Sequence, residues 1–205
     1  ALVDGILERI EDHAFAGTNI RRLRLYNNRL TEIPDLRDIS ASLTLLDLSG
    51  NRINSSLTPL LNLTSLTHLG LSNNPLHSVD PDFYSLFLHL TQLEFLNLAS
   101  CGLSSFLDDG PVNKTSDVLL ELDLSRNPLS QVPPIQSLHL HRLRLYHTDI
   151  ILQPGDLQNL PFLKELYFEN NKISSLSVFS ELSQTLETLD LSYSDLSHFP
   201  PIELF

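Results

Sequence analysis

Three histidines, His139, His141 and His147, lie close together and are the first residues whose type could do chemistry. Histidine is the commonest metal-ligating side chain, so their spacing raises the possibility of a metal site. No carboxylate or cysteine stands at ligand spacing beside His139 and His141, and zinc usually takes three or four such groups. We therefore expect solvated histidines here, with no metal and no other cofactor.

The remaining candidates for chemistry are also better explained without it. Asp108 and Asp109 could indicate calcium, but an acidic loop tip is the simpler interpretation in a chain of net charge −12. Cys101 is the single cysteine and cannot form an internal disulfide. The sequence holds no HExxH, GxSxG or CxxC motif and no glycine-rich phosphate loop. We expect no enzymatic activity.

Two short segments, IRRLRLYN and LHRLRLYH, place arginine and tyrosine together in an otherwise acidic protein. Arginine and tyrosine are enriched at the hot spots of protein interfaces, although arginine also serves simply to keep a strand surface soluble. The sequence predicts a protein-binding surface made by the following residues: Arg142, Arg144, Tyr146, Tyr167, Tyr193, Arg22, Arg24 and Tyr26.

A repeat positions these residues. The pattern LxxLxLxxNxL occurs eight times, with spacings of 23, 23, 27, 26, 21, 23 and 23 residues, and a partial unit with Leu2 and Leu7 precedes it. Leucine makes up nearly a quarter of the chain. Alternation within LxL turns the leucines inward and their neighbours outward. One such unit cannot close its own core, so neighbouring units must stack. The eight units open at Ile20, Leu43, Leu66, Leu93, Leu119, Leu140, Leu163 and Leu186.

These motifs resemble the leucine-rich-repeat family, and the segment IEDHAFAG resembles the second half of its typical extracellular class, as in Toll-like and chaoptin-like ectodomains. The resemblance implies an α/β-type solenoid, a horseshoe with one parallel strand per repeat on its concave face and loops or short helices on its convex side. We expect residues 1–205 to form one solenoid fragment, truncated at both ends. The polar segment 108–117 is the expected protruding loop.

The asparagine position of the repeat has a structural explanation. The turn after each strand leaves backbone groups facing the core, and buried polar groups need hydrogen-bond partners. An inward side chain that can donate a hydrogen bond supplies them in each repeat. Cys101 therefore has a structural role in a column of polar side chains. This column reads Asn28, Asn51, Asn74, Cys101, Asn127, Thr148, Asn171 and Ser194.

Charge and hydropathy narrow the class of partner. A net charge of −12 argues against nucleic acid and against an anionic membrane surface. No apolar run approaches the roughly 18 residues that a membrane span needs. Asn54, Asn62 and Asn113 each begin a glycosylation sequon outside the strand motifs, which gives mild support for secretion.

The sequence thus favours an extracellular or cell-surface recognition module, of the kind used in innate immunity or adhesion, that binds a protein ligand or co-receptor. Two alternatives stay open: a cytosolic scaffold or adaptor with the same repeats, and the docking region of a larger enzyme. We expect the main contact on the sixth to eighth strands, with Glu165 and Glu169 at its acidic edge. Reversing the charges of Arg142 and Arg144 should then weaken binding without lowering the melting temperature.

Overall fold

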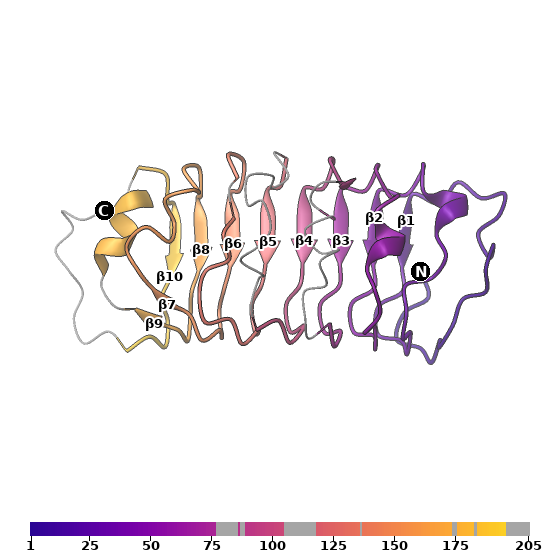
Figure 1. The fold of residues 1–205 in the computed structure, drawn as a ribbon, viewed down its shortest axis with the longest axis horizontal. Coiled ribbons are helices and arrows are strands. Elements are labelled where there is room, and N and C mark those ends of the chain that lie inside the picture. The colour runs from indigo at the N-terminus through magenta and orange to yellow at the C-terminus, as the bar shows by residue number, and fades with distance from the viewer. Residues whose placement is uncertain are drawn as a thin grey trace.

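The protein is a solenoid of short parallel strands, seen in a computed structural model (Figure 1). The structure describes residues 1–76, 86, 89–104, 118–135, 137–173, 176–182 and 184–195. One sheet holds eight strands in the order β1-β2-β3-β4-β5-β6-β8-β10. Their bounds are β1 Arg22–Arg24, β2 Leu45–Asp47, β3 His68–Gly70, β4 Phe95–Asn97, β5 Glu121–Asp123, β6 Arg142–Arg144, β8 Glu165–Tyr167 and β10 Thr188–Asp190.

Every strand of this sheet pairs in parallel with the strand of the next repeat, and always at the same repeat position. Arg22 is paired with Leu45, and Arg142 with Glu165, in the same register. The register also holds across the longest repeats, where His68 pairs with Phe95 and Phe95 with Glu121. The expected architecture of one parallel strand per repeat is therefore confirmed.

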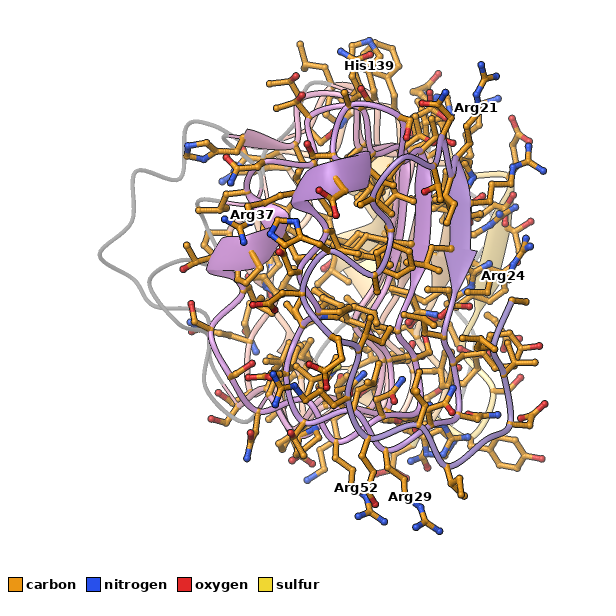
Figure 2. The ribbon with its side chains drawn as sticks, turned by 90° about the vertical axis from the view of Figure 1, so that its right-hand side faces the viewer. Arg21, Arg24, Arg29, Arg37, Arg52 and His139 are labelled. Carbon is orange, nitrogen blue, oxygen red and sulfur yellow. The ribbon has the colours of Figure 1, made fainter. Side chains whose placement is uncertain are left out.

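The return segments that the structure describes lie on the opposite side of the solenoid from the sheet (Figure 2). They contain turns and the short 3-10 helices η1 Arg37–Ile39, η2 Thr58–Leu60 and η3 Leu176–Leu182. A second, two-stranded parallel sheet joins β7 Ile151–Leu152 to β9 Lys172–Ile173. None of the helices in the described ranges has the length and apolar character needed to cross a membrane.

The repeat leucines form one continuous core between the sheet and the return segments. The central residue of each three-residue strand from β1 to β8 is buried, while its two neighbours are more exposed in most of these strands. Ile33 from the return half is buried as well, and Ile10 and Val132 pack against the core. The core contains the inward side chains, so the outward side chains of the strands form a surface.

The asparagine column forms a hydrogen-bonded ladder through the core. In Asn74, the side-chain Nδ2 donates to the carbonyl oxygens of Leu48 and Leu71, at 3.0 and 2.9 Å. Its Oδ1 accepts from the backbone N–H of Ile53 at 3.0 Å. Asn51 makes the same set of bonds one repeat earlier. Each of these amides thus serves its own repeat and the preceding one, which ties neighbouring repeats together.

The ladder changes where the column has no amide. The Cys101 Sγ donates to the carbonyl oxygen of Leu71 at 3.3 Å, but a thiol offers no equivalent of the amide oxygen. The N–H that an amide would serve, that of Leu76, turns instead to the carbonyl oxygen of Asn74 at 2.8 Å. Thr148 has the same effect on the N–H of Leu129, which bonds to Asn127 at 2.7 Å. A tighter local turn therefore replaces the missing acceptor.

A second column, just before the ladder, was not expected from the sequence. Eight successive repeats place a residue in the left-handed region, with φ between 53° and 65°. Only glycine and, less readily, asparagine adopt this conformation at low cost. The signal in the sequence was weak because half of the positions hold other residues. The column consists of Asn27, Gly50, Asn73, Ser100, Arg126, His147, Asn170 and Tyr193.

Candidate protein-binding surface

The outward side chains of the eight strands form one surface, which we call the strand face and which corresponds to the expected concave side. Figure 2 shows it in profile, with Arg24 projecting from it and Arg37 on the opposite side. Three rows of residues cross the strands. The first runs Arg22, Leu45, His68, Phe95, Glu121, Arg142, Glu165, Thr188; the second Arg24, Asp47, Gly70, Asn97, Asp123, Arg144, Tyr167, Asp190; the third Tyr26, Ser49, Ser72, Ala99, Ser125, Tyr146, Glu169, Ser192.

Arg142 lies between two glutamates of the neighbouring strands. Its Nε and Nη2 donate to the two carboxylate oxygens of Glu165, the latter bond being 2.6 Å long, and its Nη1 donates to Glu121. These bonds raise the pKa of Arg142 further above its ordinary value. The same contact with Arg142 is the main reason why the pKa of Glu165 is lowered. A guanidinium held in this way is already neutralised by the protein itself.

Arg144 and Tyr167 extend this network. The Arg144 guanidinium lies 5.4 Å from the centre of the Tyr167 ring, and its Nη1 lies 3.4 Å from Glu121. The Tyr167 hydroxyl donates to Glu165 at 3.0 Å. Glu165 therefore occupies the middle of the cluster and not its edge. Two arginines and two glutamates give the cluster no net positive charge.

Arg22 and Arg24 on β1 are in a different state. Both are exposed, and neither forms an ion pair among the residues that the structure describes. Tyr26 lies beside them, partly buried. Seven of the 13 basic residues fall within residues 1–52. The strand that sequence reasoning ranked second is thus the one whose positive charge is available to a partner.

The two remaining tyrosines of the predicted set lie at adjacent positions of the repeat. Tyr146 belongs to the third row of the strand face, and Arg126 lies 5.6 Å from its ring centre. Tyr193 follows β10, is 88% exposed and has a left-handed backbone. It belongs to the turn column with His147 and Asn170, so it contributes to the edge of the solenoid rather than to the strand face itself.

A depression of about 340 Å³ opens on the strand face across β1 to β6. Gly70 lies near its middle and contributes no side chain. A Cβ at this position would lie 2.8 Å from the Asp47 Oδ1, so the Asp47 carboxylate leans over the glycine. On the other side of Gly70, the rings of His68 and Phe95 stack with their centres 4.2 Å apart. The depression therefore combines an acidic group with an aromatic wall.

Glu169 is the most unfavourably placed carboxylate on the surface. Its Oε2 is buried and has no hydrogen-bond partner among the described residues. Burial is the main cause that raises the pKa of Glu169, and the charge of Asp190 adds to it. The pKa of Asp190 is lowered, chiefly by the hydroxyl and N–H of Ser192. The pKa values of Glu169 and Asp190 are therefore shifted in opposite directions.

The three histidines do not converge on one point, because strand β6 separates His147 from His139 and His141. His147 Nδ1 lies 2.8 Å from the side-chain amide of Asn170.

Cys101 is fully buried, and burial raises the pKa of its thiol to about 11, which keeps it protonated and unreactive at neutral pH.

Of the predicted glycosylation sites, Asn54 and Asn62 are exposed and lie in return segments on either side of η2. A glycan at either position would leave the strand face uncovered. Asn113, together with the acidic pair Asp108 and Asp109, lies outside the described residues.

Comparison with known families agrees with the repeat read from the residues. A family model described as Leucine Rich Repeat matches residues 42–63 and 65–86. The solved structure of internalin C2 from Listeria monocytogenes is 28% identical and superposes with a TM-score of 0.74, covering 90% of this chain and 79% of that one. The chain is a leucine-rich-repeat protein. Its strand face is formed by the equivalent outward residues of successive repeats.

Several leucine-rich-repeat relatives match most of the chain. Podocan-like protein 1 from Homo sapiens is 32% identical over 209 residues, which cover 88% of this chain and 40% of that protein. Toll-like receptor 8 from Homo sapiens is 32% identical over 194 residues, covering 85% of this chain and 16% of the receptor. A leucine-rich-repeat kinase from Caenorhabditis elegans matches 45% of this chain with 4% of its own length. The chain thus spans well under half the length of these relatives.

Proposed function

We propose that this leucine-rich-repeat chain is an extracellular or cell-surface module that recognises a protein ligand or co-receptor through its strand face. The proposal rests on the separate roles of the inward and the outward side chains. The inward leucines and the ladder hold the fold, while the outward rows place arginine, tyrosine, histidine and carboxylates on a continuous surface that the core does not use. Rigid solenoids present such surfaces to macromolecular partners.

The chemistry of the surface supports a protein partner over the other classes. Arginine and tyrosine residues of the strand face are types enriched at protein interfaces. The net charge of −12 disfavours nucleic acid and an anionic membrane. An extracellular location is supported by the resemblance to the typical extracellular repeat class, by a relative that is a Toll-like receptor, and by the exposure of Asn54 and Asn62.

Within the strand face, β1 is the best candidate for direct contact with acidic groups of a ligand. Arg22 and Arg24 are exposed and unpaired among the described residues, so binding need not break an existing ion pair. Arg142 and Arg144 act in the proposed interface as part of a preorganised network with Tyr167, in which each charge is already oriented. Tyr146 and Tyr193 flank this network and Tyr26 flanks β1.

The test blocks the strand face without disturbing the core. The pair Arg22→Asn and Arg24→Thr creates a glycosylation acceptor on β1 and breaks no ion pair of the described structure. Expressed in a secretory host, this variant should lose the protein partners that the wild-type chain captures from secreted and cell-surface proteins. The wild-type chain, glycosylated at Asn54 on the return side, is the reference in this comparison, and Asn54→Gln is the matched control that should keep the partners. Undiminished capture by the β1-glycosylated variant would refute binding through this face.

The same expression experiment separates the proposal from a cytosolic scaffold. A secreted extracellular module should carry glycans at Asn54 and Asn62, seen as a mass shift that glycosidase removes. A cytosolic scaffold or the docking region of a larger enzyme would keep the same fold without them. The kinase relative, whose match covers under half of this chain, is the comparison that favours testing the docking alternative.

A further inference from the structure

The depression around Gly70 holds carboxylates that no basic side chain neutralises. Asp123 is only 8% exposed and lines the depression. Its Oδ1 accepts the backbone N–H of Ser125 at 3.0 Å, and the Asp47 Oδ1 accepts that of Ser49 at 3.1 Å. In the described part of the chain, neither aspartate forms an ion pair with an arginine or lysine. A buried carboxylate without a cation is unfavourable, and an incoming cation would relieve that cost.

Arg24 and Arg144 also line the depression, but neither forms an ion pair with Asp47 or Asp123 among the described residues. Arg144, the register partner of Asp123, is drawn to Glu121 and to the Tyr167 ring instead. Arg24, the register partner of Asp47, is exposed on β1 and forms no ion pair with it. The hydrogen bond from the serine N–H fixes one oxygen of each aspartate. The same bond orients the carboxylate, and its second oxygen has no hydrogen bond among the described residues.

The wall of the depression suits the stem of a long basic side chain. The stacked rings of His68 and Phe95 stand in the first row, beside Gly70 in the second. Thr67 Oγ1 lies 2.8 Å from His68 Nδ1 and holds that ring in place. Arginine and lysine bury their aliphatic stems against apolar surface while the charged head reaches a carboxylate, and a guanidinium also stacks on aromatic faces.

The spacing of the two aspartates defines the ligand further. Asp47 on β2 and Asp123 on β5 share one row and are three strands apart, which is about 14 Å at the usual strand spacing. In an extended peptide, residues i and i+4 point to the same side and lie about 13 Å apart. An extended segment crossing the strands could therefore place one side chain at each aspartate.

We propose that the depression around Gly70 binds an extended basic segment of the partner protein, with arginine or lysine at positions i and i+4 meeting Asp47 and Asp123. This inference rests on the proposed function in taking the partner to be a protein. It adds the chemistry of the segment that is recognised. The acidic charge of the whole chain, −12, favours the approach of such a segment.

The probe is the peptide acetyl-Arg-Ser-Gly-Ser-Arg-amide, and its control replaces both arginines with citrulline, which has the same shape without the charge. Titration into the isotope-labelled chain, followed by NMR, should shift the backbone amide signals of Gly70 and Asn97. We expect the citrulline peptide to bind at least tenfold more weakly. Equal binding of the two peptides, or shifts centred away from Gly70, would overturn the proposal. A peptide with glutamate in place of arginine should not bind, and stronger binding of that peptide would assign the site to an acidic ligand.

Asparagine substitutions test the two carboxylates without loss of the fold. Asn97 occupies the same repeat position and accepts the N–H of Ala99 at 3.0 Å, so an amide preserves the structural hydrogen bond. Asp47→Asn and Asp123→Asn should each weaken the arginine peptide at least fivefold. Asp190→Asn is the matched control, because Asp190 accepts the N–H of Ser192 at the same position but lies outside the depression. An equal loss in the Asp190 variant would contradict a specific site.

The outcome separates the two proposals. Loss of partner capture on blocking β1, combined with no charge-dependent peptide binding, would retain the recognition function and reject the basic segment. Specific peptide binding combined with undiminished capture would retain the charge-dependent peptide site and reject the strand face as the surface that the captured partners use.

Discussion

The strand face has two halves that handle charge differently. From β5 to β8, glutamates and arginines on adjacent strands satisfy one another, with Arg142 shared by Glu121 and Glu165. From β1 to β5, Arg24, Asp47 and Asp123 face the surface without an ion pair among the described residues, around a glycine that leaves a hollow. The same repeat therefore produces a self-paired half, β5 to β8, whose charged side chains pair with one another, and an open half, β1 to β5, whose charged side chains do not. An arginine of the strand face therefore has free charge for a partner only where the neighbouring strands do not supply its counter-charge.

The largest effect on stability is expected from the ladder. In the open half, no strand-face ion pair of the described residues joins the strands, so the ladder supports this half. Asn74→Leu removes the acceptor of the Ile53 N–H and the donor to the carbonyls of Leu48 and Leu71. Each buried group left without a partner costs about 1–3 kcal/mol. The free energy of unfolding, measured by denaturant titration, should fall by at least about 3 kcal/mol.

The control for this variant is Cys101→Ser, which keeps a donor toward the Leu71 carbonyl. It should change the free energy of unfolding far less than Asn74→Leu. A larger loss in the cysteine variant would contradict the role of the column.

The next effect concerns the self-paired half. Arg142→Glu would place a third carboxylate between Glu121 and Glu165, so we expect a destabilisation of about 2 kcal/mol or more, visible as a lower melting temperature. This result differs from the expectation drawn from the sequence, which left stability unchanged. Arg24→Glu, in the open half, should alter the free energy of unfolding by less than about 0.5 kcal/mol. Equal losses would erase the distinction between the two halves.

A smaller effect is expected at the turn column. Gly50 has φ of 65°, and a Cβ there would lie 2.2 Å from the Asn27 Oδ1. Gly50→Ala should cost about 1–2 kcal/mol from the left-handed backbone, with a further contribution if Asn27 cannot move aside. Combining it with Asn27→Gly removes the contact without adding left-handed strain at residue 27, where φ is 55°. A thermal melt of the double variant that is no higher than that of Gly50→Ala would show that the contact does not matter.

The smallest effect distinguishes buried from paired carboxylates on the strand face. The pKa of Glu169 is raised, so its ionised form is disfavoured in the folded chain at pH values above its folded pKa. Glu169→Gln should therefore raise the melting temperature at pH 7, by an amount on the order of 1 °C. The gain should vanish below the unfolded pKa of about 4.3, where glutamate is protonated in both states.

Glu165 provides the comparison of opposite sign. Its pKa is lowered by Arg142, so its carboxylate contributes stability above the unfolded pKa and loses it as pH falls through the folded pKa. Glu165→Gln should lower the melting temperature at pH 7. If both glutamine variants shifted stability in the same direction at pH 7, the assignment of the two carboxylates would be wrong.

The fold was predictable because the repeat encodes it redundantly. Alternation places the strand leucines inside, and the strands pair in the register that the LxxLxLxxNxL frame predicts, even across repeats of 27 and 26 residues. The pairing of charges was not predictable in the same way. Whether Arg142 meets Glu165 depends on side-chain rotamers across two strands, which periodicity does not determine. The hollow at Gly70 was missed for a related reason, since it arises from what one residue lacks among neighbours that come from other repeats.

The constancy of the register across repeats of unequal length has a consequence for the shape of the molecule. Hydrogen bonds fix the separation of neighbouring strands at about 4.8 Å whatever the length of the segment between them. A repeat can therefore gain or lose residues outside its strand while the strand spacing of the sheet stays the same. An insertion outside a strand would then change the curvature of the strand face without changing any residue on it, so the shape and the chemistry of this face can vary independently.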